Sequence, residues 1–305
     1  MKYIKIPFEL QSHGGETLDA IKFIPENPIG IVQIIHGMAE HIHRYEDFAG
    51  FLAEHGYIVV GHTHAGHGKN AKLLGYFAGE GGWNILLEDI DSVRKSMSSE
   101  YPNLPYFIFG HSMGSFLLRN YIQEHSDGLA GVIVCGTAKQ ALSKVKFAKA
   151  LISLILLFGN GKKPGLFMDK LNFGAFNKAI QNPRTKFDWL SRDEKNVDKY
   201  IADEYCGFAF TNMGYYDLLT GIENIETLQN NKNINKMLPV FIISGSADPV
   251  GDNGKAAQLL YNEYKRLGIE QVDISIYNDA RHELLNEINK DEVYNDILNF
   301  LERIK

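Results

Sequence analysis

Residues Tyr106 to Tyr121 read YFIFGHSMGSFLLRNY. The aromatic and β-branched run that ends at Phe109 predicts a buried strand, because strands covered on both faces are apolar throughout. From Met113 onward the apolar residues recur at helical spacing, so a helix is expected to follow the strand. Between the two elements lies Gly110-His111-Ser112-Met113-Gly114, which is a G-x-S-x-G pattern.

The spacing of this pattern indicates a specific chemistry. A very sharp turn from strand to helix holds one side chain above the sheet edge, and only glycine fits the crowded backbone two residues before and after it. The following helix N-terminus offers N–H groups and a positive dipole end to a developing oxyanion. The sequence therefore predicts Ser112 as a nucleophile. The alternative is a glycine-rich turn with an exposed serine, and a histidine and an acid in the right order would decide against it.

Further strands and helices are predicted on both sides of this stretch. The expected strands cover residues 3–10, 18–23, 31–35, 57–60, 129–135, 238–243 and 272–277. The expected helices of the same pattern cover residues 45–55, 83–101, 254–267 and 291–304. Strands that alternate with helices predict an α/β fold with a mostly parallel central sheet flanked by helices. In such sheets ligands bind beyond the carboxyl ends of the strands, which is where Ser112 would lie.

The composition changes after Cys135. Residues 138–236 contain no clear parallel strand, and helical pieces are expected at 148–158, 177–180, 193–203 and 216–228. We interpret an all-helical insert before the last two strands as a lid over the site. The predicted domains are therefore a first core segment, 1–137, a helical lid, 138–236, and a second core segment, 237–305.

The bulk composition restricts the partners. The 305 residues carry a formal net charge of −6 and no block of basic residues, which argues against nucleic acid. Two cysteines do not make a disulfide framework. The N-terminus alternates like a strand and lacks the apolar core of a signal peptide, so the cytoplasm is the expected location. The most apolar run, 148–158, is too short to span a bilayer.

Two late loops supply the histidine and the acid. Asp248 follows a predicted strand after the insert, and His282 follows the last predicted strand. The order Ser, Asp, His is that of α/β-hydrolases. His282 would take the proton of Ser112, and Asp248 would orient the imidazole and stabilise its cation. The backbone N–H groups of Met38 and Met113 are the expected oxyanion hole.

Rival residues lie near these loops. Asp252 is a minor rival to Asp248 as the acid, and Asp279 is a weaker one because it lies so close to the histidine in sequence. The histidines at 62, 64 and 67 have no cysteine or carboxylate at a typical zinc spacing, so we predict no metal site there.

Charged residues follow the predicted oxyanion loop. Glu40, His41 and Arg44 allow two interpretations. The slightly favoured one is a local salt-bridge cluster. The functional one is that Arg44 or Glu40 contacts a polar head group of the substrate.

The chain resembles the monoglyceride lipase and lysophospholipase branch of the α/β-hydrolases, which merges into serine aminopeptidase-like sequences. The resemblance covers nearly the whole chain. The core motifs that carry it are His36-Gly37-Met38-Ala39-Glu40-His41 with Arg44-Tyr45, Gly66-His67-Gly68, the G-x-S-x-G motif, Gly245-Ser246-Ala247-Asp248, and His282. Two segments of the insert, 187–192 and 203–208, resemble the lid of bacterial lysophospholipase-like members.

The resemblance implies hydrolysis of a carboxylic ester without a cofactor. It implies Ser112, Asp248 and His282 as the triad, the same oxyanion hole, and Arg44 near the glycerol end of the substrate. The family usually has an aspartate where this chain has Thr63, so the loop that follows is expected to be held differently.

The predicted substrate is a single-chain lipid, either a lysophospholipid or a monoacylglycerol, cleaved through an acyl-enzyme. The apolar run 148–158 would line an acyl tunnel, touch a membrane surface transiently, or form the core of the lid itself. The enzymatic alternatives are a short-chain carboxylesterase and an aminopeptidase-like hydrolase. The non-enzyme alternative is a catalytically silent module that uses the lid pocket to bind a ligand. The sequence gives no indication of an oligomeric state.

Overall fold

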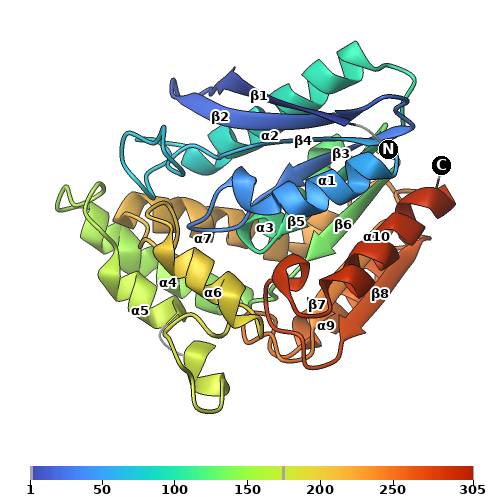
Figure 1. Cartoon of the computed structure of the whole chain (residues 1–305). Helices are drawn as coiled ribbons and strands as arrows, with labels where there is room; N and C mark the ends of the chain where they lie inside the picture. The colour runs from blue at the N-terminus through green and yellow to red at the C-terminus, as the bar shows by residue number, and fades with distance from the viewer. Residues whose placement is uncertain (1–2, 174–175, 305) are drawn as a thin grey trace.

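One eight-stranded sheet runs through the protein in the order β1-β2-β4-β3-β5-β6-β7-β8 (Figure 1). The computed structural model describes residues 3–173 and 176–304. The strands are β1 Tyr3–Gln11, β2 Thr17–Pro25, β3 Gly30–Ile35, β4 Tyr57–His62, β5 Tyr106–His111, β6 Gly131–Cys135, β7 Val240–Gly245 and β8 Val272–Tyr277. From β4 across to β8 all neighbours are parallel, whereas β2 is antiparallel to both of its neighbours, β1 and β4. The mostly parallel sheet predicted from the sequence is confirmed.

The five central strands are β4, β3, β5, β6 and β7, and every residue in them is buried. Their side chains alternate between two hydrophobic cores because successive residues of a strand point to opposite faces. Ile31 and Ile35 belong to one core, whereas Val32 and Ile34 belong to the other. This two-sided burial explains why the central strands are continuous apolar runs in the sequence.

Helices cover both faces of the sheet (Figure 1). The first core contains side chains of α2 Gly82–Glu100, α3 Met113–His125 and α9 Lys255–Arg266. The second core contains side chains of α1 Glu46–Glu54 and α10 Lys290–Ile304. A short 3₁₀ helix, η1 Ile42–Tyr45, leads into α1, and another, η3 Leu284–Asn286, precedes α10. This is the doubly covered α/β architecture expected for alternating strands and helices.

The segment between β6 and β7 is helical. It contains α4 Leu142–Leu156, α5 Leu166–Phe173, η2 Phe176–Ala179, α6 Glu194–Ala202, α7 Asn212–Glu226 and α8 Leu228–Asn231. The expected bounds were wrong at several points. α4 begins six residues before the predicted apolar run. The lysines of its first turns interrupt the apolar pattern in the sequence, but they lie on an exposed face of the helix. α7 begins earlier than predicted, directly after its N-cap Thr211, whose side chain accepts a hydrogen bond from Gly214 N–H. α5 was not expected at all.

The insert packs tightly against the core through α7. Gly221 on α7 lies against the ring of Trp83 on α2, and a Cβ added to this glycine would lie 2.0 Å from that ring. Asp217, one turn earlier on α7, lies against Gly82 at the start of α2 in the same way. Two close approaches on one helix hold the insert in a fixed position over the sheet. Among residues 3–173 and 176–304, no helix has the length and apolar character required to cross a membrane.

Candidate active site

The turn at Ser112 has the strained geometry that its motif predicts. Ser112 lies between β5 and α3 with φ of 53° and ψ of −119°, a region that residues other than glycine rarely adopt. A Cβ on Gly110 would lie 2.4 Å from the carbonyl oxygen of Gly114, and one on Gly114 would lie 2.1 Å from that of Ile35. The two glycines are therefore required by close backbone contacts, and they present the serine side chain at the carboxyl end of β5.

The structure brings the three predicted triad residues together. His282 Nε2 lies 2.8 Å from Ser112 Oγ, and His282 Nδ1 lies 3.0 Å from Asp248 Oδ2. Asp248 and His282 are both buried. The second carboxylate oxygen of Asp248 accepts a hydrogen bond from Val250 N–H at 2.9 Å. This arrangement favours the tautomer in which Nδ1–H donates to Asp248 and Nε2 accepts from the serine hydroxyl.

The two rival acids lie elsewhere. Asp252 is exposed and pairs with Lys255 at 3.3 Å. Asp279 is exposed as well, and its backbone N–H donates to Ser246 Oγ. Only Asp248, of the three aspartates considered, contacts the histidine ring.

The loop after β3 lies directly against the serine. A Cβ on Gly37 would lie 3.2 Å from Ser112 Cβ, so the chain at Gly37 and Met38 approaches the hydroxyl closely. Gly37 N–H donates to Glu40 Oε1 at 2.6 Å, which fixes the loop from inside. Within the described residues, the backbone N–H groups of Met38 and Met113 donate to no protein acceptor. Both of the predicted oxyanion donors are therefore free to bind a substrate oxygen.

A buried ion-pair network supports this loop. Arg44 pairs with Glu40 at 2.5 Å and makes two hydrogen bonds of 2.7 Å to the carboxylate of Glu283. Glu40 also accepts from the Tyr45 hydroxyl, and that hydroxyl lies 3.0 Å from His111 Nδ1. For Glu40 and Arg44, these contacts match the interpretation as a local salt-bridge cluster. The network joins the loop after β3, the turn at the serine and the loop that carries the histidine.

Charge compensation controls ionisation inside this network. Burial alone raises the pKa of the Glu40 carboxyl, but the Arg44 charge and the hydrogen bonds from His111 and Tyr45 outweigh it and hold that pKa well below its ordinary value. Burial lowers the pKa of His111, but the neighbouring Glu40 carboxylate reverses the effect and raises it overall. His111 Nε2 lies 3.2 Å from the backbone oxygen of His282. The network therefore keeps Glu40 ionised and links it to the backbone of the histidine loop.

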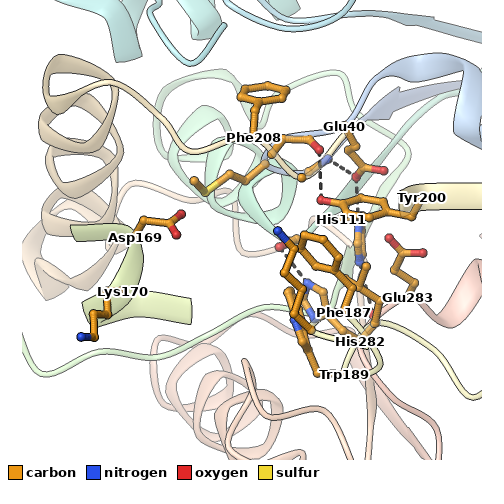
Figure 2. A pocket seen from close by; sticks show the side chains of 17 residues that line it. Glu40, His111, Asp169, Lys170, Phe187, Trp189, Tyr200, Phe208, His282 and Glu283 are labelled. Atoms are coloured by element: carbon orange, nitrogen blue, oxygen red, sulfur yellow. Dashed lines mark hydrogen bonds and ion pairs between the residues drawn. The ribbon is translucent and has the colours of Figure 1, made fainter. Parts of the chain in front are cut away.

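Ser112 and His282 line a cavity of about 330 Å³. Figure 2 shows this cavity and labels ten of its lining residues. Its apolar lining comes mainly from the insert, and the side chains concerned are Phe187, Trp189, Leu190, Tyr200 and Phe208 together with Met38. The Trp189 ring lies 5.3 Å from the His282 ring. Asp169, Lys170 and Lys186 add charged groups to the wall. Glu40 lines the cavity as well, whereas Arg44 does not.

The histidines at 36, 62, 64 and 67 form a buried group at the ends of β3 and β4. His36 Nε2 accepts a hydrogen bond from His64 N–H at 2.9 Å, and the rings of His36 and His64 lie 4.0 Å apart. Burial lowers the pKa of His62 and that of His67 to about 4. Thr63, the residue that departs from the family pattern, accepts weakly from Ile42 N–H at 3.4 Å. Packing and backbone hydrogen bonds therefore hold this loop.

Several residues around the site were missed by sequence reasoning. Glu283 directly follows His282 and pairs with Arg44, but no local pattern in the sequence indicates this contact. His111 lies inside the serine motif, yet nothing in that motif indicates its contact with Glu40. The sequence did not indicate which aromatic residues of the insert line the cavity, because their contact with the cavity depends on tertiary packing.

The sheet, the strained serine turn and the loops around it define the class of α/β-hydrolases. A family model described as serine aminopeptidase, S33 matches residues 26–289. The match covers most of the chain, so the chain belongs to this family. The predicted membership of the α/β-hydrolases, in the branch similar to monoglyceride lipases, is confirmed.

Individual relatives agree with this assignment. The chain is 26% identical to human monoglyceride lipase over 262 residues, which are 86% of this chain and 78% of that protein. It is 24% identical to the monoacylglycerol lipase of Mycolicibacterium smegmatis over 286 residues, 90% of this chain and 89% of that protein. A solved carboxyl esterase of Bacillus coagulans, in complex with glycerol, is 30% identical, with a TM-score of 0.93 over 99% of both chains. The protein is a serine ester hydrolase.

We expect the stability of the protein to fall as the pH is lowered from 6.5 toward 4. In this interval the unfolded chain carries a proton on His62 that the folded chain lacks, so unfolding takes up a proton. Neither ring nitrogen of His62 has a hydrogen-bond partner among the described residues. His62→Leu should therefore reduce the slope of the unfolding free energy against pH by up to about 1.4 kcal/mol per pH unit.

Urea unfolding between pH 7.5 and pH 5 measures this slope. The exposed His55 supplies a control, since His55→Gln should leave the slope near that of the wild type. An unchanged slope in His62→Leu would contradict the expectation.

Arg44→Met should lower the free energy of unfolding by about 3–5 kcal/mol, because it leaves the buried carboxylates of Glu40 and Glu283 without their cation. Urea unfolding measures the loss. The matched control is Lys5→Met, which breaks an exposed pair with Glu46 and should cost less than about 1 kcal/mol. Unchanged stability together with a raised KM for polar lipids alone would instead make Arg44 a head-group contact.

Proposed function

We propose that the protein hydrolyses carboxylic esters of single-chain lipids, either monoacylglycerols or lysophospholipids. The observation that carries the proposal is the hydrogen-bonded series Ser112, His282 and Asp248, of which Ser112 and His282 line a cavity with an apolar wall. The similarity to monoglyceride and monoacylglycerol lipases supports the choice of lipid.

Catalysis would proceed in two halves. His282 Nε2 removes the proton as Ser112 Oγ attacks the ester carbonyl, and Asp248 stabilises the imidazolium that forms. The N–H groups of Met38 and Met113 bind the oxyanion of the tetrahedral intermediate. His282 then protonates the leaving alcohol, and the acyl group stays on the serine. A water, deprotonated by the same histidine, attacks the acyl-enzyme and releases the fatty acid.

The acyl chain would occupy the apolar part of the cavity. Phe187, Leu190 and Phe208 offer hydrocarbon and aromatic surface, and burying a chain against them removes apolar area from water. All three come from residues 138–236, the segment that we propose as a lid. Arg44 is already paired with two carboxylates, so Glu40 and Arg44 act on the head group only if that pairing loosens.

Initial rates on p-nitrophenyl esters from acetate to palmitate, with monoacylglycerol and lysophosphatidylcholine alongside, test the proposal. Rates should rise with chain length, and both natural lipids should be cleaved. Ser112→Ala and Asp248→Asn should each lower kcat by at least about 10³-fold. Asp252→Asn is the matched control and should retain the wild-type rate.

Other outcomes of the same series would separate the alternatives. Turnover of short esters alone would make the protein a short-chain carboxylesterase, and faster turnover of amino-acid amides would make it an aminopeptidase-like hydrolase. Full activity in Ser112→Ala would refute the assignment of the nucleophile.

We further propose that the insert contacts a membrane surface. Six large apolar side chains on two successive helices and the segment between them are more than half exposed, namely Phe147, Leu154, Leu157, Phe158, Leu166 and Phe167. Lys162 and Lys163 lie exposed within the same segment. An exposed apolar face with neighbouring lysines suits the boundary between head groups and acyl chains. A surface of this kind would let a sparingly soluble lipid enter the cavity directly.

A double variant, Leu157→Ser with Phe158→Ser, should weaken binding to phosphatidylcholine/phosphatidylglycerol vesicles by at least about tenfold, because it removes two of the most exposed apolar side chains. Co-sedimentation measures the binding, and turnover of p-nitrophenyl acetate should not change. Leu259→Ser, at an exposed leucine of α9, is the control. Equal binding of both variants would exclude this surface.

A further inference from the structure

His41, Asp203 and Cys206 bring three different metal-ligating atoms together outside the cavity wall. One nitrogen of His41, one carboxylate oxygen of Asp203 and the sulfur of Cys206 all lie within 4.8 Å of one another. All three side chains are partly buried. His41 follows the oxyanion loop, whereas the other two belong to the insert. We propose that this cluster binds a thiophilic divalent cation of the zinc type, and that the bound cation slows ester hydrolysis.

The donor set suits zinc. Zinc accepts imidazole nitrogen, carboxylate oxygen and thiolate sulfur, and three protein ligands leave a fourth position for water. The ligand atoms of a tetrahedral zinc site lie roughly 3.4–3.6 Å apart. His41 Nε2 and Asp203 Oδ2 are now 2.8 Å apart in a hydrogen bond. A cation would replace the proton between them, and small side-chain movements would bring the sulfur into range.

The backbone already holds two of the ligands. Asp203 Oδ1 accepts from Tyr205 N–H at 2.9 Å, which leaves Oδ2 turned toward His41. Cys206 N–H donates to the carbonyl oxygen of Asp203 at 3.1 Å, so a tight turn places the sulfur beside the carboxylate. Residues whose orientation is fixed before binding lose less entropy when they coordinate an ion.

The surrounding charges favour a cation. Arg44, a positive charge that acts on both Asp203 and Cys206, is already neutralised by Glu40 and Glu283. Asp203 adds a third carboxylate near the same place, so the local charge remains negative. Burial raises the pKa of the Cys206 thiol. Coordination therefore releases the thiol proton to solvent, and the expected affinity is moderate.

The bound cation would connect the insert to the oxyanion loop. The carbonyl oxygen of Ala39, two residues before His41, accepts from Gly207 N–H at 2.9 Å and from the Tyr200 hydroxyl at 3.1 Å. A cation held by His41, Asp203 and Cys206 would tie the same two segments together more strongly. Entry of substrate beneath the insert would then be hindered. Only this effect on turnover rests on the proposed function, because binding of the cation does not.

Isothermal titration calorimetry with Zn²⁺ tests binding without reference to activity. The wild type should bind one Zn²⁺ at this site, and Cys206→Ser and His41→Gln should each weaken that binding at least about tenfold. Co²⁺ supplies an independent readout, since a cobalt–thiolate bond gives a charge-transfer absorption that Cys206→Ser should lack. His13→Gln, at an exposed histidine outside the cluster, is the matched control.

Turnover of p-nitrophenyl esters with and without Zn²⁺ tests whether the bound cation slows ester hydrolysis. Zn²⁺ should lower the rate of the wild type and of His13→Gln, with recovery on adding EDTA. Cys206→Ser should keep the metal-free rate and resist Zn²⁺. Unchanged affinity in both cluster variants, or no cobalt–thiolate band in the wild type, would overturn the site. Equal inhibition of Cys206→Ser would overturn its link to turnover, whereas an inactive wild type would refute the proposed function and leave the calorimetry valid.

Discussion

The close approach of backbone at Ser112 is the constraint on which the rest of the site depends. The left-handed φ at this residue persists only because the chain packs around it without any Cβ at Gly110 or Gly114. The contact of Gly114 with the carbonyl oxygen of Ile35 also joins the serine turn to the end of β3. Strain at one residue thus places the loop after β3 beside the hydroxyl.

A second layer of interactions keeps the loops aligned. Arg44 forms ion pairs with two carboxylates that belong to different loops. One of them, Glu40, also accepts hydrogen bonds from Gly37 N–H and from the Tyr45 hydroxyl. Desolvation makes such a buried network costly unless every charge is paired. The charges of Arg44 and its partners keep Glu40 ionised, and ionised Glu40 holds the loop after β3 through Gly37 N–H.

The insert contributes the wall of the cavity rather than the reacting groups. Gly221 and Asp217 anchor it to α2, while Phe187, Trp189, Tyr200 and Phe208 line the same cavity as His282 (Figure 2). Gly207 and Tyr200 of the insert also donate hydrogen bonds to the carbonyl oxygen of Ala39, in the loop after β3. The insert therefore contacts both the cavity and the loop after β3. The membrane contact that we propose would explain why the insert carries exposed apolar side chains on its outer surface as well as in the cavity.

The sequence by itself determined the succession of strands and helices in the core, the sharp turn at Ser112 and the placement of Asp248 and His282 after strand ends, because each follows from local periodicity or from glycine at a sharp turn. The helix bounds in the insert were less predictable, since tertiary contacts and caps decide where such helices begin. Only the tertiary structure decided the partners of Arg44, the lining of the cavity, and the meeting of His41 with Asp203, which are 162 residues apart. Such contacts arise when the insert folds back over the sheet, and no local pattern encodes a distance between segments so far apart in the chain.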